Sequence, residues 1–174
     1  MLIEFYDCFP FPAYFFCASL YLLPLQVRPG APGQLFVQGR IITMSMSRHV
    51  VFRLPGGEIK GELSDVPGID SLLSQLPVSS KGNVWGEEIY FEITRAIPVG
   101  GKTKDVDVGE IAYWEEGKSV CIFFGPTPIS RSTRPEPYVP VFSIGKVDIG
   151  DASMKILREF EQGNIITLEK SSVR

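Results

Sequence analysis

Short runs in which apolar and polar residues alternate dominate the chain from residue 48 onward. A two-residue period is typical of β-strands, because successive side chains of a strand point to opposite faces. Pro-Gly at 55–56 and Glu-Glu-Gly-Lys at 115–118 predict two β-hairpin turns, with Gly117 available for a positive φ. The predicted strands cover residues 48–54, 57–63, 83–93, 109–114, 119–124, 139–147 and 164–170.

Two stretches instead show the 3.6-residue period of an amphipathic helix. Residues 64–77 start at a capping Ser64 or Asp65 and stop at Pro77. Their apolar stripe consists of Ile69, Leu72, Leu73 and Leu76. Residues 151–163 form the second predicted helix, with Asp151 as N-cap. Mostly antiparallel strands with helices near both ends predict a closed barrel capped by two helices, because closure removes exposed strand edges.

The composition changes sharply near residue 47. Residues 1–47 carry four charged side chains, and the remaining 33 follow residue 47. The apolar stretch at 11–25 is shorter than the roughly 20 residues that a membrane-spanning helix needs. We therefore expect residues 1–46 to be a non-core extension, with a start codon assigned too early, a weak anchor and a true structural extension as the alternatives. The folded domain is predicted at 47–170, followed by a tail at 171–174.

Charge and cysteine content exclude several classes of function. The net charge is −3, and no basic stripe with interleaved aromatic residues occurs, which argues against nucleic-acid binding. Three cysteines and one histidine, His49, provide neither a disulfide framework nor the spacing of a metal site. Cys121 lies inside an apolar strand, as a buried structural cysteine does. We expect a cytoplasmic protein without a metal or cofactor, and membrane association is disfavoured.

Three stretches resemble a known family. WGEEIYFEI (85–93), VGEIAYWEEGKSVCIFFGPTPIS (108–130) and PYVPVFSIGKV (137–147) are similar to the prokaryotic cyclophilin-like family of uncharacterised proteins. The resemblance covers about residues 48–170. It implies a mainly β fold, a closed eight-stranded cyclophilin-like barrel with two capping α-helices.

The same resemblance raises the possibility of peptidyl-prolyl isomerase activity. That chemistry needs a cationic donor beside the prolyl imide, to lower a barrier of about 18–20 kcal/mol. True cyclophilins carry a Phe-His-Arg stretch where this chain has VWGEEIYFEI, which contains no arginine. Arg95, Arg131 and Arg134 are the candidates for a displaced guanidinium. The alternatives to an isomerase are a ligand-binding protein and a non-catalytic interaction module.

Candidate ligand-binding residues surround the second hairpin. The resemblance aligns CIFF (121–124) with the cyclophilin Ser-Gln-Phe-Phe motif. The loop at 125–140 contains five prolines, and loops of this length are often functional. We expect a surface groove for an unknown peptide or small molecule. Its predicted lining residues are Phe124, Thr127, Tyr113, Trp114, Ile122 and Phe142.

One carboxylate, Glu87, is a further weak catalytic candidate. Strand alternation places it on the face of Trp85, Ile89 and Phe91, opposite Glu88. A carboxylate among apolar side chains needs a partner and is expected to have a shifted pKa. The alternative interpretation is a residue at a strand end that is hydrogen-bonded to a loop backbone.

Overall fold

The computed structural model describes residues 34–37, 40–43 and 48–171. The chain divides after Ser45 into two units. In the first unit, β1 (Gln34–Val37) pairs antiparallel with β2 (Arg40–Thr43). The predictions for residues 1–46 and for the C-terminal tail fall mainly on residues outside the described ranges.

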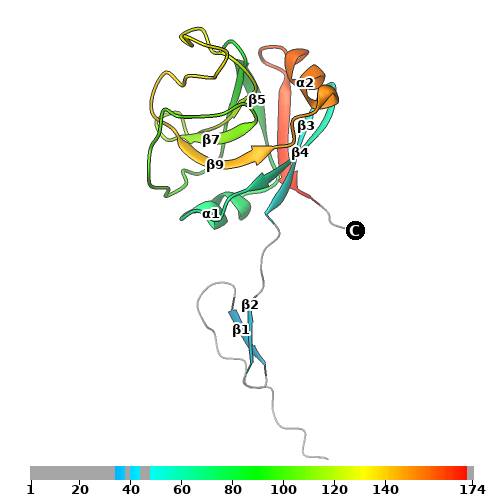
Figure 1. Ribbon diagram of the computed structural model, residues 1–174. Coiled ribbons are helices and arrows are strands. Elements are labelled where there is room, and N and C mark those ends of the chain that lie inside the picture. The colour runs from blue at the N-terminus through cyan, green and yellow to red at the C-terminus, as the bar shows by residue number, and fades with distance from the viewer. Residues whose placement is uncertain (1–33, 38–39, 44–47, 172–174) are drawn as a thin grey trace, which may run out of the picture. The chain divides into compact units, whose positions relative to one another are not determined.

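The second unit is a closed barrel of eight antiparallel strands (Figure 1). The strand order around the barrel is β10-β3-β4-β9-β7-β8-β6-β5, and β5 closes the barrel by pairing with β10. The predicted barrel is therefore confirmed. Its strands are β3 (His49–Leu54), β4 (Gly57–Leu63), β5 (Val78–Val84), β6 (Glu88–Glu92), β7 (Glu110–Trp114), β8 (Ser119–Phe123), β9 (Phe142–Val147) and β10 (Ile165–Lys170).

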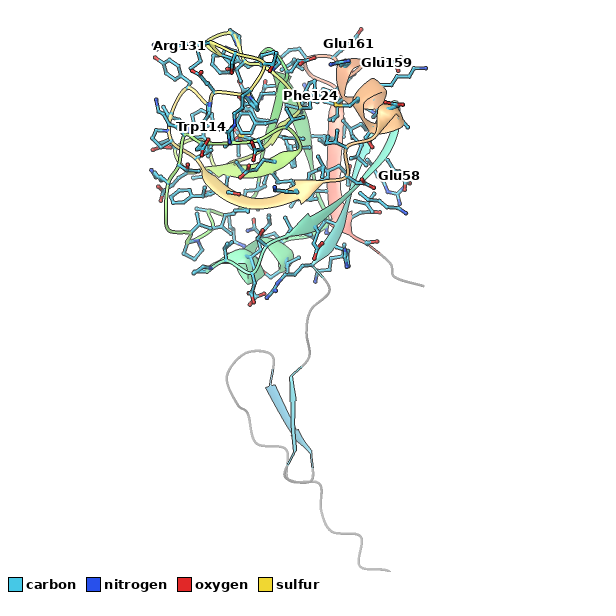
Figure 2. The ribbon with its side chains drawn as sticks, in the orientation of Figure 1. Glu58, Trp114, Phe124, Arg131, Glu159 and Glu161 are labelled. Carbon is cyan, nitrogen blue, oxygen red and sulfur yellow. The ribbon has the colours of Figure 1, made fainter. Side chains whose placement is uncertain are left out.

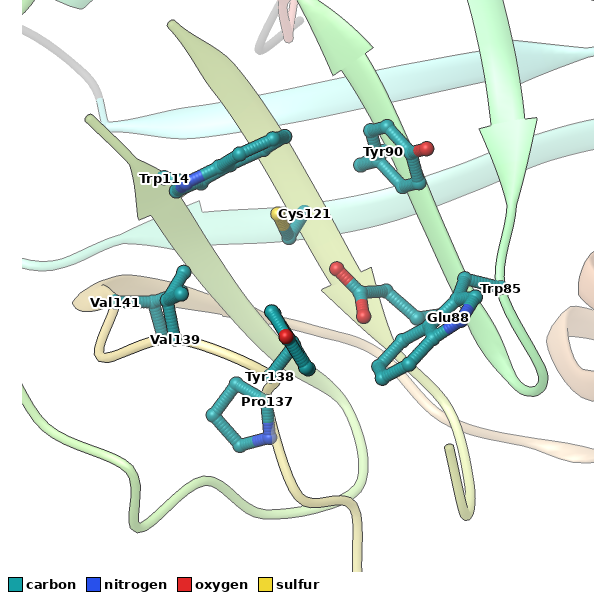
Figure 3. A pocket seen from close by; sticks show the side chains of 9 residues that line it. All are labelled: Trp85, Glu88, Tyr90, Trp114, Cys121, Pro137, Tyr138, Val139 and Val141. Carbon is teal, nitrogen blue, oxygen red and sulfur yellow. The ribbon is translucent and has the colours of Figure 1, made fainter. Parts of the chain in front are cut away.

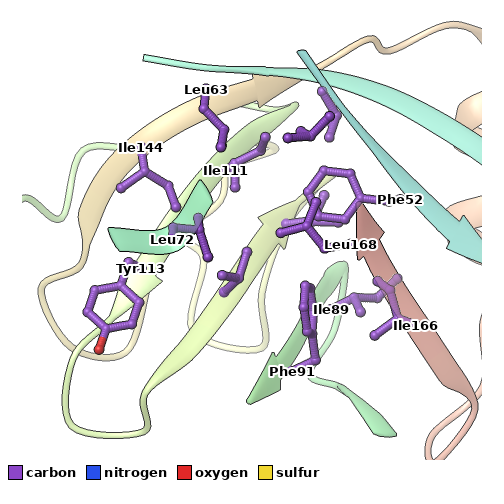
Figure 4. Close-up of a cluster of buried hydrophobic side chains, with 14 of the residues drawn as sticks. Phe52, Leu63, Leu72, Ile89, Phe91, Ile111, Tyr113, Ile144, Ile166 and Leu168 are labelled. Carbon is purple, nitrogen blue, oxygen red and sulfur yellow. The ribbon is translucent and has the colours of Figure 1, made fainter. Parts of the chain in front are cut away.

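Alternate residues of these strands fill the barrel interior (Figure 4). Phe52 and Phe91 meet edge to face, with ring centroids 6.3 Å apart, and both are fully buried. Tyr113 and Phe142 stack at the same centroid separation. Each fully buried aliphatic or aromatic side chain contributes about 1.5–3 kcal/mol relative to exposure. The interior is thus the main source of stability.

Two helices lie at opposite ends of the barrel (Figure 1). The first, α1 (Ile69–Leu73), is shorter than predicted and has no side-chain cap. Its N-cap residue is Gly68, with a φ of +87°, and a Cβ there would collide with the carbonyl oxygen of Pro98. Asp65, a predicted cap, instead forms an ion pair with Arg48.

The second helix, α2 (Asp151–Arg158), packs on the barrel through Leu157, and the following Phe160 is also buried. Its N-cap residue is Gly150, with an extended backbone, so Asp151 is the first helical residue and not the predicted cap. An acidic residue in this first turn is favoured by the partial positive charge of a helix N-terminus.

The predicted strand over 83–93 is two strands. β5 ends at Val84 and β6 begins at Glu88, and they form a hairpin in which Val84 pairs with Ile89. Gly86 adopts a φ of +64° in the intervening turn. The period-two alternation is therefore interrupted at residues 85–87. In the turn between β7 and β8, the positive φ belongs to Lys118, at 46°, and not to the predicted Gly117.

Candidate functional site

The outer face of β6, β8 and β7 carries a second set of buried side chains. Tyr90 of β6 lies opposite Cys121 of β8, which lies opposite Ala112 of β7. Their neighbours in sequence point into the barrel, so these side chains point outward. Cys121 and Ala112 are nevertheless buried, with exposures of 1% and 0%. Segments before β7 and before β9 cover this face, because Val106 and Val141 pack in the same cluster.

A cavity of about 310 Å³ opens on this outer face (Figure 3). The strands supply its floor, and residues 137–139 with Val141 supply the opposite wall. Its lining residues are Trp85, Glu88, Tyr90, Trp114, Cys121, Pro137, Tyr138, Val139 and Val141. Most of these side chains are apolar or aromatic, and Glu88 is the one ionisable carboxyl group among them.

Four aromatic rings of the wall form two edge-to-face pairs. Tyr90 and Trp114 have ring centroids 6.0 Å apart, at an interplanar angle of 81°. Trp85 and Tyr138 are 6.2 Å apart, at 82°. This geometry is favoured by the aromatic quadrupole, since the positive edge of one ring meets the negative face of the other. Tyr138 is 71% exposed and therefore lies at the mouth of the cavity.

The hairpin turn before β8 fixes the position of Trp114. Gly117 lies under the indole, and a Cβ at this position would collide with ring atoms of Trp114. Glycine is thus required here for the close approach of a ring to the backbone, not for an unusual φ.

Glu88 is the chemically distinctive residue of the cavity. Its carboxylate points into the space between the rings and toward Cys121 (Figure 3). The residue is only 8% exposed, and burial raises the pKa of Glu88 from 4.5 to about 7. The neighbouring Cys121 thiol offsets part of this effect. At neutral pH, Glu88 is therefore able to donate or accept a proton.

Cys121 does not have the character of a nucleophile. Its side chain is buried, and burial together with the nearby Glu88 carboxylate raises the pKa of its thiol well above the ordinary value. Reactive cysteines require the opposite environment, one that stabilises the thiolate. Cys121 acts here as a small apolar wall residue and as a neighbour of Glu88.

The long loop before β9 is held by a polar network at its base. The Thr127 hydroxyl donates to the carbonyl oxygen of Glu136 at 2.6 Å, and the Thr127 backbone N–H donates to the Ser130 hydroxyl at 2.9 Å. Thr103 and Val141 exchange two backbone hydrogen bonds, of 2.7 and 2.8 Å. These bonds position residues 137–141 over the sheet without any regular secondary structure.

The structure separates the six predicted ligand-binding residues. Trp114 lines the cavity. Tyr113, Ile122, Phe124 and Phe142 are 0–5% exposed and belong to the barrel interior, so they share no groove with Trp114. The reason is the strand pleat, which directs adjacent residues such as Tyr113 and Trp114 to opposite faces.

Thr127 and Glu87 also lie away from the cavity lining. Thr127 is buried, with an exposure of 5%, and its hydrogen bonds serve the loop itself. Glu87 lies in the turn before β6, where its carboxylate accepts a hydrogen bond of 2.9 Å from Arg158 of α2. Its backbone N–H donates a hydrogen bond of 3.0 Å to the carbonyl oxygen of Pro126. Glu87 thus matches the interpretation of a residue at a strand end that bonds to a loop, and the buried carboxylate is its neighbour Glu88.

The three candidate arginines do not reach the cavity. Arg95 donates to the Ser74 hydroxyl near α1, at 3.4 Å. Arg134 forms ion pairs of 2.8 Å with Asp105 and Asp107. Arg131 is exposed, and Figure 2 shows it at the periphery of the barrel unit. Within residues 48–171, no arginine, lysine or histidine lines the cavity.

Sequence reasoning missed every lining residue other than Trp114, including Glu88, Tyr90, Trp85 and Tyr138. The signal for two of them was available, since alternation places Glu88 and Tyr90 together on the face opposite Ile89 and Phe91. No ligand-binding residue was predicted on that face of β6. A distant loop covers it, and no local pattern in β6 reveals such a cover.

Among the described residues, no group of three or more His, Cys, Asp or Glu side chains is placed to hold a metal ion. No helix in the same part of the chain has the length and apolar character needed to cross a membrane.

Comparison with known proteins identifies the family. The model of the family described as cyclophilin-like matches residues 48–169. The solution structure of a hypothetical protein from Archaeoglobus fulgidus is similar, with a TM-score of 0.59 and 27% sequence identity, over 72% of this chain and 95% of that one. A search of curated proteins gives no match. The chain therefore belongs to the cyclophilin-like family.

Proposed function

We propose that the protein binds a small molecule in the cavity on the outer face of β6, β8 and β7. The observation that carries this proposal is a mostly apolar cavity, about 310 Å³ in volume, with one buried carboxylate directed into it. Ligand sites in proteins are typically concave and apolar, with a few polar groups that orient the ligand. Their volumes span roughly 300–1,000 Å³, so this cavity suits a small ligand or a single side chain of a peptide.

Prolyl isomerisation is the less favoured alternative. A cyclophilin-like fold makes it worth testing, because fold alone does not define activity. The cavity, however, offers no cationic donor from residues 48–171. We expect no acceleration in a protease-coupled prolyl isomerisation assay with the full chain. Acceleration that is lost on substitution of Arg95, Arg131 or Arg134 would instead support the isomerase.

Both tryptophans of the chain, Trp85 and Trp114, line the cavity. Selectively excited tryptophan fluorescence and the two indole N–H resonances therefore report on the cavity. We expect hits from a library of small metabolites to change both signals, and the Tyr138→Ala variant to weaken their binding. Arg131→Ala, which alters an exposed residue outside the cavity, is the matched control. A library without any hit that moves the indole resonances would contradict the proposed function.

A further inference from the structure

The carboxylate of Glu88 has no positive partner in the part of the chain that the structure describes. None of the ion pairs between residues 48 and 171 includes it. Glu87 and Glu115 differ in this respect, whereas the buried Glu110 of β7 is likewise outside these ion pairs and accepts a backbone hydrogen bond instead. Glu87 contacts Arg158 at 2.9 Å, and Lys102 contacts Glu115 at 2.8 Å. A buried charge without a partner is costly, so the site is electrostatically incomplete for the ionised form of Glu88.

Four aromatic rings surround this carboxylate (Figure 3). The negative face of an aromatic ring attracts cations, most strongly for tryptophan, and aromatic cages bind alkylated ammonium groups in this way. We propose that the cavity binds a small organic cation, an alkylated ammonium group, between the aromatic rings and the Glu88 carboxylate. This inference deepens the proposed function and rests on it.

The same chemistry argues against a calcium ion as the occupant. Calcium requires about six or more oxygen ligands. The lining residues supply one carboxylate and two tyrosine hydroxyls, those of Tyr90 and Tyr138. An alkylated ammonium group needs no such set of oxygens, because its charge is spread over methyl groups that make apolar contacts with the rings.

Binding of a cation would be linked to the proton on Glu88. The cation favours the ionised carboxylate, so binding releases a proton, and affinity increases as pH rises through about 7. The other titratable groups that face Glu88 are Cys121 of β8, Tyr90 of β6 and Tyr138 of the loop. Glu110 of β7 lies on the same face, beyond Phe123, and its carboxylate accepts a hydrogen bond from the backbone of Asp107.

The test compares choline with 3,3-dimethyl-1-butanol, its uncharged isostere, on the full-length protein. The two probes have nearly the same shape, so their difference in affinity isolates the positive charge. We expect choline to bind at least about tenfold more tightly at pH 8, by the fluorescence of the two tryptophans and by calorimetry. We expect Glu88→Gln to remove this preference and Glu87→Gln, one residue away and outside the cavity lining, to preserve it.

Three results would overturn the inference. Equal or tighter binding of the uncharged isostere would show a ligand site that does not select cations, and the proposed function would stand. A preference for choline that persists in Glu88→Gln would show that the Glu88 carboxylate does not cause the selectivity for the cation. Absence of binding by both probes would also reject the cation, and the metabolite screen would then decide the proposed function separately. A trimethyllysine peptide in parallel distinguishes a peptide source from a free metabolite.

Discussion

The two faces of the β6–β8–β7 sheet have the same strands and opposite properties. The inner face, with residues such as Ile89, Phe91 and Ile122, is closed by side chains from the rest of the barrel. The outer face, with Glu88, Tyr90 and Cys121, is closed by an irregular, proline-rich loop. The inner face is filled with side chains, whereas the outer face retains a cavity. Burial alone therefore does not distinguish a stabilising core from a binding site.

The difference follows from what covers each face. Strands that cross a barrel bring regularly spaced side chains that interdigitate and fill the space. A loop held at its base by Thr127 and Thr103 brings a few side chains at irregular positions. Large rings such as Trp85 and Tyr138 then span the remaining space without filling it. We expect the inner face to determine stability and the outer face to determine binding.

The largest effect should come from deleting an inner ring. Phe91→Ala removes a fully buried side chain that packs edge to face on Phe52. Substitutions of this kind cost about 3–5 kcal/mol, because they leave a cavity in the core. Tyr138→Ala, at an exposed ring of the outer face, should cost less than about 1 kcal/mol. Urea unfolding of both variants measures the contrast, and equal losses would contradict the division between the two faces.

The second effect concerns pH. The pKa of Glu88 is about 7 in the folded protein against 4.5 for the ordinary group, so the folded state holds this proton more tightly. Its contribution to stability is complete below pH 4.5 and is lost as the pH rises to about 7, a loss of about 3 kcal/mol.

Glu88→Gln should remove this decline in urea-unfolding experiments across the pH range. Glu87→Gln is the matched control, because Glu87 is only partly buried and its carboxylate is paired with Arg158. A wild-type protein whose stability does not fall between pH 4.5 and pH 7, relative to Glu88→Gln, would contradict the buried position of Glu88.

A smaller effect should follow from moving one wall of the cavity. Gly117→Ala places a Cβ against the indole of Trp114, which must shift. Overpacking of this kind costs about 1–3 kcal/mol. We expect a displaced Trp114 indole resonance together with weaker ligand binding. Gly100→Ala is the control, since a Cβ at Gly100 meets no atom within 4 Å. An unchanged indole resonance in Gly117→Ala would show that Trp114 is not packed on the turn.

The smallest effect should come from the ion pair of Glu87. Arg158→Ala breaks a contact of 2.9 Å between partly exposed side chains on α2 and the turn before β6. Exposed pairs contribute about 0–1 kcal/mol, less at high salt. Unfolding in low and high salt measures this effect. A loss well above 1 kcal/mol would show that the pair is more strongly shielded from solvent than its exposure indicates.

Sequence reasoning predicted the barrel because its strands alternate regularly and its hairpins carry turn residues. The same reasoning missed the strand Val78–Val84, since VSSKGNV has little apolar character. It also merged residues 83–93 into one strand, because the break at Gly86 depends on a turn packed against Pro126 and Pro128. The local sequence pattern was sufficient to predict the fold class, but it did not predict the break between β5 and β6.

The site was harder to predict than the fold. Alternation separates Tyr113 from Trp114, but it does not say which outward residues a loop will cover. Tyr138 and Pro137 come from the stretch 125–140, whose path depends on hydrogen bonds such as that of Thr127 with Glu136. Contacts between a loop and a sheet join residues that are far apart in sequence, so the spacing of residues within either segment does not predict them.

The most direct test of the account is the titration of Glu88 itself. Carbon-13 NMR of the glutamate side-chain carboxyl groups, assigned by comparison with Glu88→Gln, follows this residue with and without choline. We expect a midpoint near pH 7 in the protein alone and a lower midpoint when choline is bound. A titration midpoint of Glu88 near pH 4.5 that choline leaves unchanged would contradict both the burial of this carboxylate and its role in binding a cation.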